Sequence, residues 1–103
     1  MQVDATVLEV GVGGLYDSTN IVPRPVVTGV SALGLDHVNV LGKTLKEIAF
    51  NKGGIFKVRH MPFCCCFWTP NILLQEGVPA FSVDQPEEGM TMLKQRASEL
   101  QVR

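Results

Sequence analysis

Glu9 and His37 have side chains that could bind a metal ion, and each lies close to an apolar run. Glu9 is near the carboxyl end of its run, where open α/β sheets bind their ligands. A charge buried there is costly unless a cation or hydrogen bonds compensate it. The residues alone weigh a ligand role for Glu9 evenly against a glutamate that reaches solvent. For His37 they favour an ordinary loop histidine over a ligand or a base, because magnesium prefers oxygen ligands.

A second group of candidates comprises Lys52 and Tyr16-Asp17-Ser18. Lys52 ends a predicted helix, where a cation complements the helix dipole and needs no other function. Asp17 could accept hydrogen bonds from a bound ring, or it could cap a turn, since Asp17-Ser18-Thr19-Asn20 has turn chemistry. The glycines of Gly11-Val12-Gly13-Gly14 would let the backbone approach a ligand, although a simple tight turn is the preferred interpretation.

Two further polar segments are interpreted as structural. Gly42-Lys43-Thr44 looks like the end of a phosphate-binding loop, but His37 stands where that motif requires glycine, so we expect this segment only to begin a helix. Asp36, beside His37, is expected to cap the loop or accept a hydrogen bond.

The elements that would position these residues alternate between strands and helices. Buried strands are predicted from β-branched apolar runs, and helices from a Thr44–Glu47 capping box, a Gly53-Gly54 stop and apolar residues at helical spacing. The predicted strands are Ala5–Val10, Val26–Leu33 and Val78–Val83, the helices Thr44–Lys52 and Met90–Gln101, and the loop Gly34–Gly42. This order predicts an α/β fold with a parallel sheet.

The composition excludes several classes of protein. With 103 residues, of which 46% are hydrophobic and 18% charged, the chain fits one small globular domain. A net charge of -1 without a basic run argues against a nucleic-acid binder. No segment has the roughly 18 uninterrupted apolar residues of a membrane span. The consecutive cysteines Cys64-Cys65-Cys66 match no disulfide or zinc pattern and indicate a reducing compartment. The start of the chain has neither a secretory signal nor a transit peptide pattern.

The segment Val58–Gln75 is apolar but shows neither strand alternation nor a helical period. Val58-Arg59 can be encoded by a splice-donor-like sequence, the Phe and Cys codons are rich in pyrimidines, and a Gln75 codon can end like a splice acceptor. Translated intron sequence is therefore the favoured explanation, and a natural loop insertion is the alternative. We assign no role to the side chains within this segment.

Three phrases together resemble a known family. They are Thr6–Asn20 with its strand, carboxylate and glycine turn, then Leu35-Asp36-His37, then Asn51–Lys57. In this order they closely resemble the central ATPase domain of folylpolyglutamate synthase, a Mur-ligase-like enzyme. The resemblance runs from Met1 to about Lys57 and resumes at about Gly77. It implies a fragment, residues 1–103, of that domain: a partial parallel sheet with flanking helices, interrupted by an insert at residues 58–75.

The resemblance also implies roles for the candidate residues. In the family, the residues that match Glu9 and His37 bind magnesium. The lysine that matches Lys52 carries CO2 as a carbamate, which supports the metal site, so Lys52 is the catalytic candidate. Tyr16, Asp17 and Ser18 match the place where related enzymes hold the pterin part of the substrate.

The activity that the resemblance implies is an ATP-dependent ligation of glutamate to the γ-carboxylate of tetrahydrofolate. ATP and Mg2+ are the implied cofactors, and reduced folate, glutamate and ATP are the small-molecule partners, without nucleic acid or membrane. A monomer acting in the cytoplasm and mitochondria is implied.

The family's phosphate loop and glutamate-binding domain have no counterpart in this chain, so we expect the chain alone to be inactive. Two alternatives remain open. The first is a non-catalytic fragment or mis-spliced product with at most weak metal binding, and the second is a dihydrofolate synthase.

Overall fold

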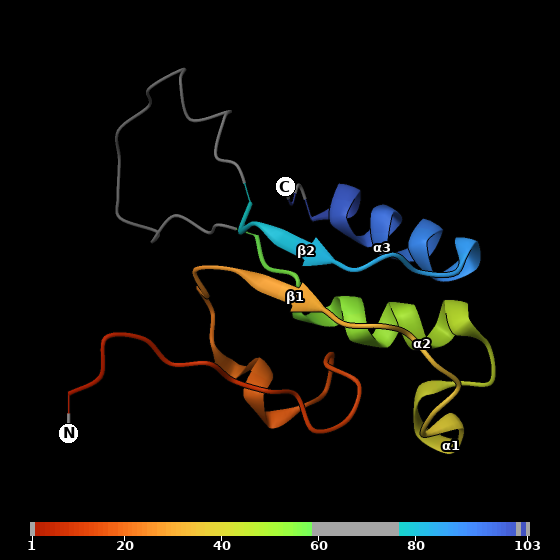
Figure 1. The fold of residues 1–103 in the computed structure, drawn as a ribbon, viewed down its shortest axis with the longest axis horizontal. Coiled ribbons are helices and arrows are strands. Elements are labelled where there is room, and N and C mark those ends of the chain that lie inside the picture. Colours follow the sequence, from red (N-terminus) through yellow and green to blue (C-terminus); the bar gives the residue numbers. More distant parts are fainter. Residues whose placement is uncertain (1, 59–76, 101, 103) are drawn as a thin grey trace, which may run out of the picture.

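The computed structural model describes residues 2–58, 77–100 and 102. Its elements, in chain order, are η1 (Ser18–Ile21), β1 (Thr28–Val30), α1 (Val38–Leu41), α2 (Leu45–Lys52), η2 (Gly53–Ile55), β2 (Ala80–Ser82) and α3 (Glu87–Glu99). Figure 1 shows the two strands side by side, with α2 and α3 next to one another. Most of the segment 58–75 lies outside the described residues.

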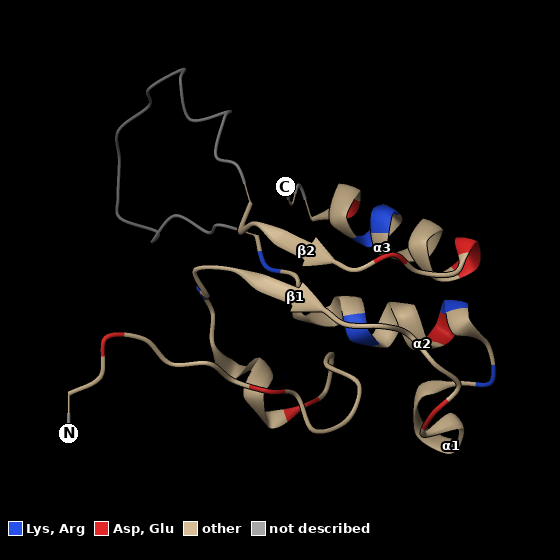
Figure 2. Ribbon diagram, viewed as in Figure 1, with Lys and Arg blue, Asp and Glu red and all other residues tan. Residues whose placement is uncertain are grey.

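The sheet consists of β1 and β2, which pair in parallel with Thr28 opposite Ala80 and Val30 opposite Ser82. This confirms the parallel pairing of the second and third predicted strands, although both are shorter than predicted. Thr28 and Val30 are buried while Gly29 between them is exposed, so one face of β1 is turned toward the core. Figure 2 shows that neither strand carries a charged residue.

The predicted strand Ala5–Val10 is wrong. These residues form no strand, and the side chains of Val7 and Leu8 are 94% and 53% exposed. A buried parallel strand needs a neighbouring strand to bond with and layers on both faces. Within the described residues there are only two strands, and they bond to each other, so this apolar run has no partner.

Helix α2 begins and ends where its local signals predict. Thr44 Oγ1 accepts a hydrogen bond from Glu47 N (3.2 Å) and Glu47 Oε2 accepts one from Thr44 N (3.1 Å), which completes the capping box. Ile48 and Ala49 are fully buried, as their spacing predicts. Gly42-Lys43-Thr44 accordingly begins a helix.

Helix α3 begins at Glu87, three residues before the predicted start. Glu87 and Glu88 occupy its first turn, where carboxylates complement the positive end of the helix. The last turn contains Arg96, at the negative end.

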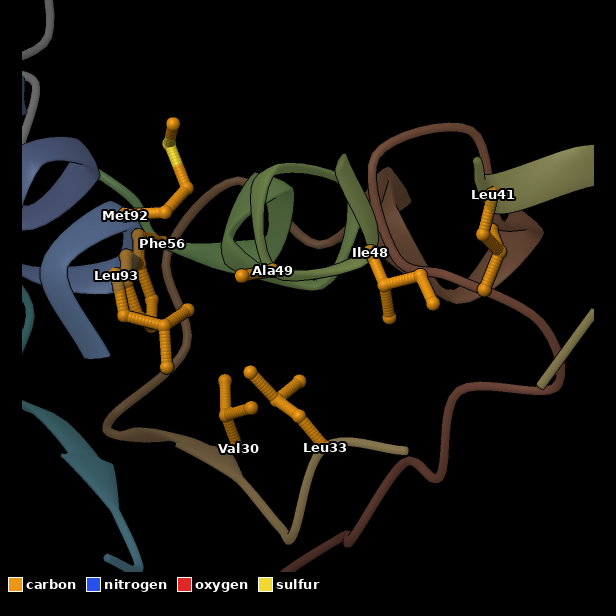
Figure 3. Packing of buried hydrophobic residues seen from close by; sticks show 8 residues of the cluster. All are labelled: Val30, Leu33, Leu41, Ile48, Ala49, Phe56, Met92 and Leu93. Atoms are coloured by element: carbon orange, nitrogen blue, oxygen red, sulfur yellow. The ribbon is translucent and has the colours of Figure 1, made fainter. Parts of the chain in front are cut away.

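The core lies between β1 and the two long helices. In Figure 3, Val30 of β1 and Leu33, which follows this strand, point toward Ile48 and Ala49 of α2 and toward Leu93 of α3. The same cluster of buried residues also contains Leu41 of α1, Phe56 and Met92. Within the described residues, none of the helices is long and apolar enough to cross a membrane.

The chain that leaves β1 is fastened to the chain that leaves β2 by Gln85. Its Oε1 accepts a hydrogen bond from Leu33 N (2.8 Å), and its Nε2 donates one to the carbonyl oxygen of Ser31 (2.8 Å). The side-chain amide thus bonds as another strand would, beyond the last paired residues. It sets the direction of the segment that leads to Asp36 and His37.

Candidate functional site

The glycine turn after Val10 packs against the end of α2. Leu15 N donates a hydrogen bond to the carbonyl oxygen of Asn51 (2.9 Å). A Cβ atom at Gly14 would lie 2.8 Å from Ile55 Cγ2 and 3.1 Å from the carbonyl oxygens of Asn51 and Lys52. Gly14 also has a φ of +151°, which side-chain-bearing residues rarely adopt. Only glycine lets the turn approach this helix end so closely.

The Asp17 carboxylate holds this turn together. Its Oδ2 accepts hydrogen bonds from Gly11 N and Val12 N (both 3.1 Å), and its Oδ1 accepts from Thr19 N (2.9 Å) and Thr19 Oγ1 (2.6 Å). These bonds, above all the one from the Thr19 hydroxyl, lower the pKa of Asp17 from 3.8 to about 2. Asp17 is also the N-cap of η1, so it has the turn-capping role that the sequence allows as the alternative to ligand binding.

Asn20 connects η1 to the segment that follows α2. Its side-chain amide donates to the carbonyl oxygens of Leu15 (3.0 Å) and Gly54 (3.2 Å). Lys57 Nζ in turn donates to the carbonyl oxygen of Asn20 (3.1 Å). The loop that carries Tyr16 to Ser18 is therefore attached at both of its ends to η2 and the residues around it.

A pocket of about 310 Å³ opens between the glycine turn and α1. One wall consists of residues 12–14 and 16–18, and the other of Val40, Leu41 and Asn51. All three residues predicted to bind substrate, Tyr16, Asp17 and Ser18, line it. The Tyr16 side chain is 90% exposed, which leaves its ring free to contact a ligand.

His37 precedes a one-turn helix within the segment predicted to be a loop. The loop prediction for Gly34–Gly42 is therefore wrong for Val38–Leu41, which form α1. His37 has a φ of +49°, in the left-handed region, and its N–H donates to Asp36 Oδ1 (2.7 Å). This confirms Asp36 as a hydrogen-bond acceptor of the loop. The imidazole is half-exposed, with Nε2 3.6 Å from Asp36 Oδ2.

The described residues do not assemble a metal site by themselves. Glu9 lies on an exposed, unpaired stretch of chain, so the premise of a carboxylate at the end of a buried strand does not hold. Lys52 is the last residue of α2 and is half-buried. Among residues 2–58, 77–100 and 102, no three His, Cys, Asp or Glu side chains are close enough to hold a metal ion. The predicted convergence of Glu9, His37 and Lys52 stays a prediction.

Sequence reasoning missed Asn20, Asn51 and Lys57, which hold the site together. Each is a polar residue in a context where exposure is the ordinary expectation. One weak signal pointed to Asn51, because asparagine is a poor helix former and here it stands next to the end of a predicted helix.

No protein-family model matches the chain. It is 48% identical to folylpolyglutamate synthase of Arabidopsis thaliana over 98% of its own length. It is 46% identical to the human protein named folylpolyglutamate synthase, mitochondrial, over 96% of its length. In both comparisons the chain spans only 14% of the relative.

Solved structures agree with these relatives. The chain matches a structure described as an FPGS-AMPPCP-folate complex with a TM-score of 0.70 and 26% identity, over 93% of this chain and 19% of that one. It matches the bifunctional folylpolyglutamate synthase/dihydrofolate synthase of Yersinia pestis, complexed with AMPPNP and a Mn ion, with a TM-score of 0.60 and 28% identity, over 91% of this chain and 18% of that one.

The α/β fold with a parallel sheet is therefore the Mur-ligase-like fold of these structures. The alignment with the Arabidopsis thaliana relative extends over 98% of the chain. Over the length that it spans, the chain is similar in sequence and in fold to folylpolyglutamate synthases.

Proposed function

We propose that this chain is a segment of the central ATPase domain of an ATP-dependent ligase that adds glutamate to the γ-carboxylate of a reduced folate. Residues 58–75 are proposed to be an insert that does not belong to this domain. Support comes from the relatives, which carry the name folylpolyglutamate synthase at 46–48% identity, and from a structural neighbour described with an ATP analogue and folate. Action in both mitochondria and the cytoplasm is part of the proposal, and the human relative's name supports the mitochondrial part.

The observation that carries the proposal is the pocket between the glycine turn and α1. It is the proposed site for the pterin ring of the folate. The exposed Tyr16 ring would stack on the flat heterocycle, and the Ser18 hydroxyl could donate or accept a hydrogen bond. The four hydrogen bonds already accepted by Asp17 favour a role in holding the wall, with a direct bond to the pterin as its additional role.

The proposed reaction proceeds in two steps. The terminal carboxylate of the folate attacks the γ-phosphate of ATP, which gives an acyl phosphate and ADP. The amine of glutamate then attacks the acyl carbon, and phosphate leaves through a tetrahedral intermediate. Positioning of the reactants supplies much of such catalysis. The proposed share of this chain is to hold the folate and to supply part of the metal site. The loop that binds the phosphates of ATP and the glutamate-binding domain are proposed to lie in parts of the longer relatives that the chain does not span.

Glu9 and His37 are proposed ligands of a divalent cation, Mg2+, and Lys52 is proposed to support that site as a carbamate. A divalent cation is supported by the neighbour complexed with AMPPNP and Mn. Because the described residues do not form a three-ligand site, further ligands would have to come from ATP and from the rest of the longer protein. Bound Mg2+ would neutralise charge on the transferring phosphate.

The test of the proposed function uses the 103-residue chain, which is proposed to be a monomer, and two assays. Calorimetric titration with folate should show binding that Tyr16→Ala weakens, while Val26→Ala, at an exposed residue outside the pocket, leaves it unchanged. A coupled assay should show no folate-dependent ADP release, even with glutamate and magnesium. Failure to bind folate would contradict the assignment of the pocket as the folate site. ADP release would contradict the proposal that the isolated chain lacks the groups needed to cleave ATP.

The metal proposal is tested in a full-length relative that carries the matching glutamate. The Glu9→Gln change keeps the shape of the side chain and removes its charge. Loss of a ligand that holds a metal at the transferring phosphate should cost several kcal/mol of transition-state stabilisation. Turnover should fall steeply at limiting magnesium, with the circular dichroism spectrum unchanged. Near-normal turnover would remove Glu9 from the metal site.

A dihydrofolate synthase is the second candidate, favoured by the bifunctional Yersinia pestis neighbour. That reaction uses the same acyl phosphate chemistry with dihydropteroate as the acceptor of glutamate. Titration of the chain with dihydropteroate beside folate would discriminate the two, because only a pure dihydrofolate synthase would prefer dihydropteroate. The remaining alternative, a non-catalytic or mis-spliced fragment with at most weak metal binding, would bind neither ligand.

A further inference from the structure

Asn51 forms hydrogen bonds with both walls of the pocket. It lies on α2, immediately before Lys52, is half-buried, and lines the pocket. Its backbone and its side chain bond to different parts of the chain. The backbone accepts a hydrogen bond from the glycine turn, and the side chain donates one to α1 and one within α2.

The backbone of Asn51 fixes the first wall. Its carbonyl oxygen accepts the hydrogen bond from Leu15 N (2.9 Å), and the glycine turn lies directly on it, since a Cβ at Gly14 would be 3.1 Å from the same oxygen. This bond depends on the course of α2 and not on the identity of the side chain. Any residue at this position that preserves the helix would keep the first wall in place.

The side chain of Asn51 fixes the second wall. Its Nδ2 donates to the carbonyl oxygen of Leu41 (2.9 Å) at the end of α1 and to that of Glu47 (3.1 Å) one turn back in α2. A helix as short as α1 is unstable alone, because the cost of nucleation is not recovered in a single turn. Burial of the Leu41 side chain and this bond to its otherwise free carbonyl are what hold α1 against α2.

We propose that Asn51 is a positioning residue that sets the separation of the two pocket walls, and through it the fit of the ligand. The part of this proposal that concerns ligand binding rests on the proposed function. The part that concerns the position of α1 does not. The same bond also places α1, which begins directly after His37, relative to Lys52, the residue next to Asn51. One amide group thus relates the pocket to two of the residues proposed for the metal site.

The effect of the Asn51 side chain on the position of α1 is tested without ligand, by amide hydrogen exchange measured with NMR. Asn51→Ala and Asn51→Asp remove the donor, and Asn51→Gln keeps it. Loss of a net hydrogen bond of about 1 kcal/mol should speed exchange at Val40 and Leu41 about fivefold. The carboxylate of Asn51→Asp faces two carbonyl oxygens and should show the larger effect. Exchange at Leu15 should not change in any variant, and Asn51→Gln should restore most of the protection.

The effect of Asn51 on ligand binding is tested by titrating the same variants with folate. The dissociation constant should rise about five- to tenfold for Asn51→Asp and less for Asn51→Ala, because the aspartate carboxylate also repels the two carbonyl oxygens that the amide had bonded. Asn51→Gln should bind nearly as the unmodified chain does. The matched control is Asn39→Ala, because Asn39 lies exposed on the same short helix and outside the pocket.

Each outcome decides the proposal. Unchanged exchange at Val40 and Leu41 in Asn51→Ala would overturn it, as would equal effects of Asn51→Ala and Asn39→Ala. If the unmodified chain does not bind folate, the proposed function fails, and the exchange data alone decide the role of Asn51. If Asn51→Asp does not fold, Asn51→Ala decides, since alanine is the strongest helix former and preserves α2.

Discussion

Each oxygen of the Asp17 carboxylate accepts two hydrogen bonds, so this residue is expected to make the pocket wall sensitive to acid. Its folded-state pKa, about 2, lies below the ordinary value of 3.8. A group whose pKa is lowered by folding stabilises the fold fully above its ordinary pKa, and that contribution is lost as the pH falls toward the folded-state value. The relevant window therefore extends from about pH 4 down to pH 2.

Asp17→Asn should abolish this dependence. The amide nitrogen cannot accept the hydrogen bonds from Gly11 and Val12, so the variant should be less stable than the unmodified chain above pH 4. The difference between the urea midpoints of Asp17→Asn and the unmodified chain should become smaller as the pH approaches 2. Asp84→Asn, at an exposed residue, is the control. Its urea midpoint should show no such change with pH relative to that of the unmodified chain. If the difference in urea midpoint between Asp17→Asn and the unmodified chain stays constant with pH, the Asp17 carboxylate does not hold the turn together.

Gly54 and Gly29 make a matched pair for testing the contact between η2 and the glycine turn. A Cβ at Gly54 would lie 2.5 Å from both Cα and Cβ of Leu15, whereas a Cβ at Gly29 would meet nothing within 4 Å. Gly54→Ala should therefore cost about 1–3 kcal/mol, as overpacking does. Gly29→Ala should be neutral or slightly stabilising, because alanine loses less backbone entropy in a strand. Chemical denaturation measures both, and equal midpoints would contradict the close approach.

At the scale of elements, α2 depends on its N-terminal cap. Thr44→Ala removes the hydroxyl that accepts from Glu47 N, which should lower the free energy of unfolding by about 1 kcal/mol. Thr91→Ala, at an exposed threonine within α3, is the control and should be neutral or stabilising, since alanine favours helix. If the two variants unfold at the same urea concentration, the capping box does not contribute to the stability of the folded chain.

Elements with local signals could be predicted from the sequence, and elements that depend on distant partners could not. The capping box joins residues three apart, Thr44 and Glu47, and it was confirmed. The glycine that follows Lys52 marks the end of α2 as predicted, although Gly53 is right-handed, with a φ of -66°, and not in the left-handed conformation expected of a glycine stop. The strand at Ala5–Val10 was wrong because a strand exists only where another strand bonds to it. Helix α1 was missed because it depends on the side chain of Asn51, ten residues away.

The candidate site divides in the same way. Tyr16, Asp17 and Ser18 were placed by their resemblance to a family, and the structure brings them to one pocket. Asn20 and Lys57 were missed because their role is a contact between segments 37 residues apart. No property of an isolated asparagine or lysine distinguishes such a role from solvent exposure.

At the scale of the whole molecule, the chain on either side of the segment 58–75 is already close together. Val78 N donates a hydrogen bond to the carbonyl oxygen of Lys57 (3.2 Å). Removal of residues 58–75 would join Lys57 to Glu76, and the same bond would then close the four-residue turn Lys57-Glu76-Gly77-Val78. A hydrogen bond from residue i+3 to residue i is typical of a β-turn, and glycine suits its third position.

Deletion of residues 58–75 should therefore leave the free energy of unfolding unchanged or raise it, as short connections between a helix and a strand commonly do. Urea denaturation of the deleted and the complete chain measures the difference. The control is a deletion of the same segment with Gly77→Val, which should be less stable because a β-branched residue disfavours the turn. A loss of more than about 2 kcal/mol on deletion, a core-sized effect, would show that the segment is part of the structure.

The pairing of β1 with β2 also has a consequence for the order of events during biosynthesis. Leu33 and Gln85 bond across 52 residues, so the sheet cannot close before the later strand has left the ribosome. Because protein synthesis adds about 5–20 residues per second, β1 remains unpaired for about 3 to 10 seconds after it is made. During that interval Val30 and Leu33 lack the α3 side chains that later cover them. The nascent chain is thus exposed to chaperones and proteases for a time set by the rate of translation, and slow codons between the two strands would lengthen it.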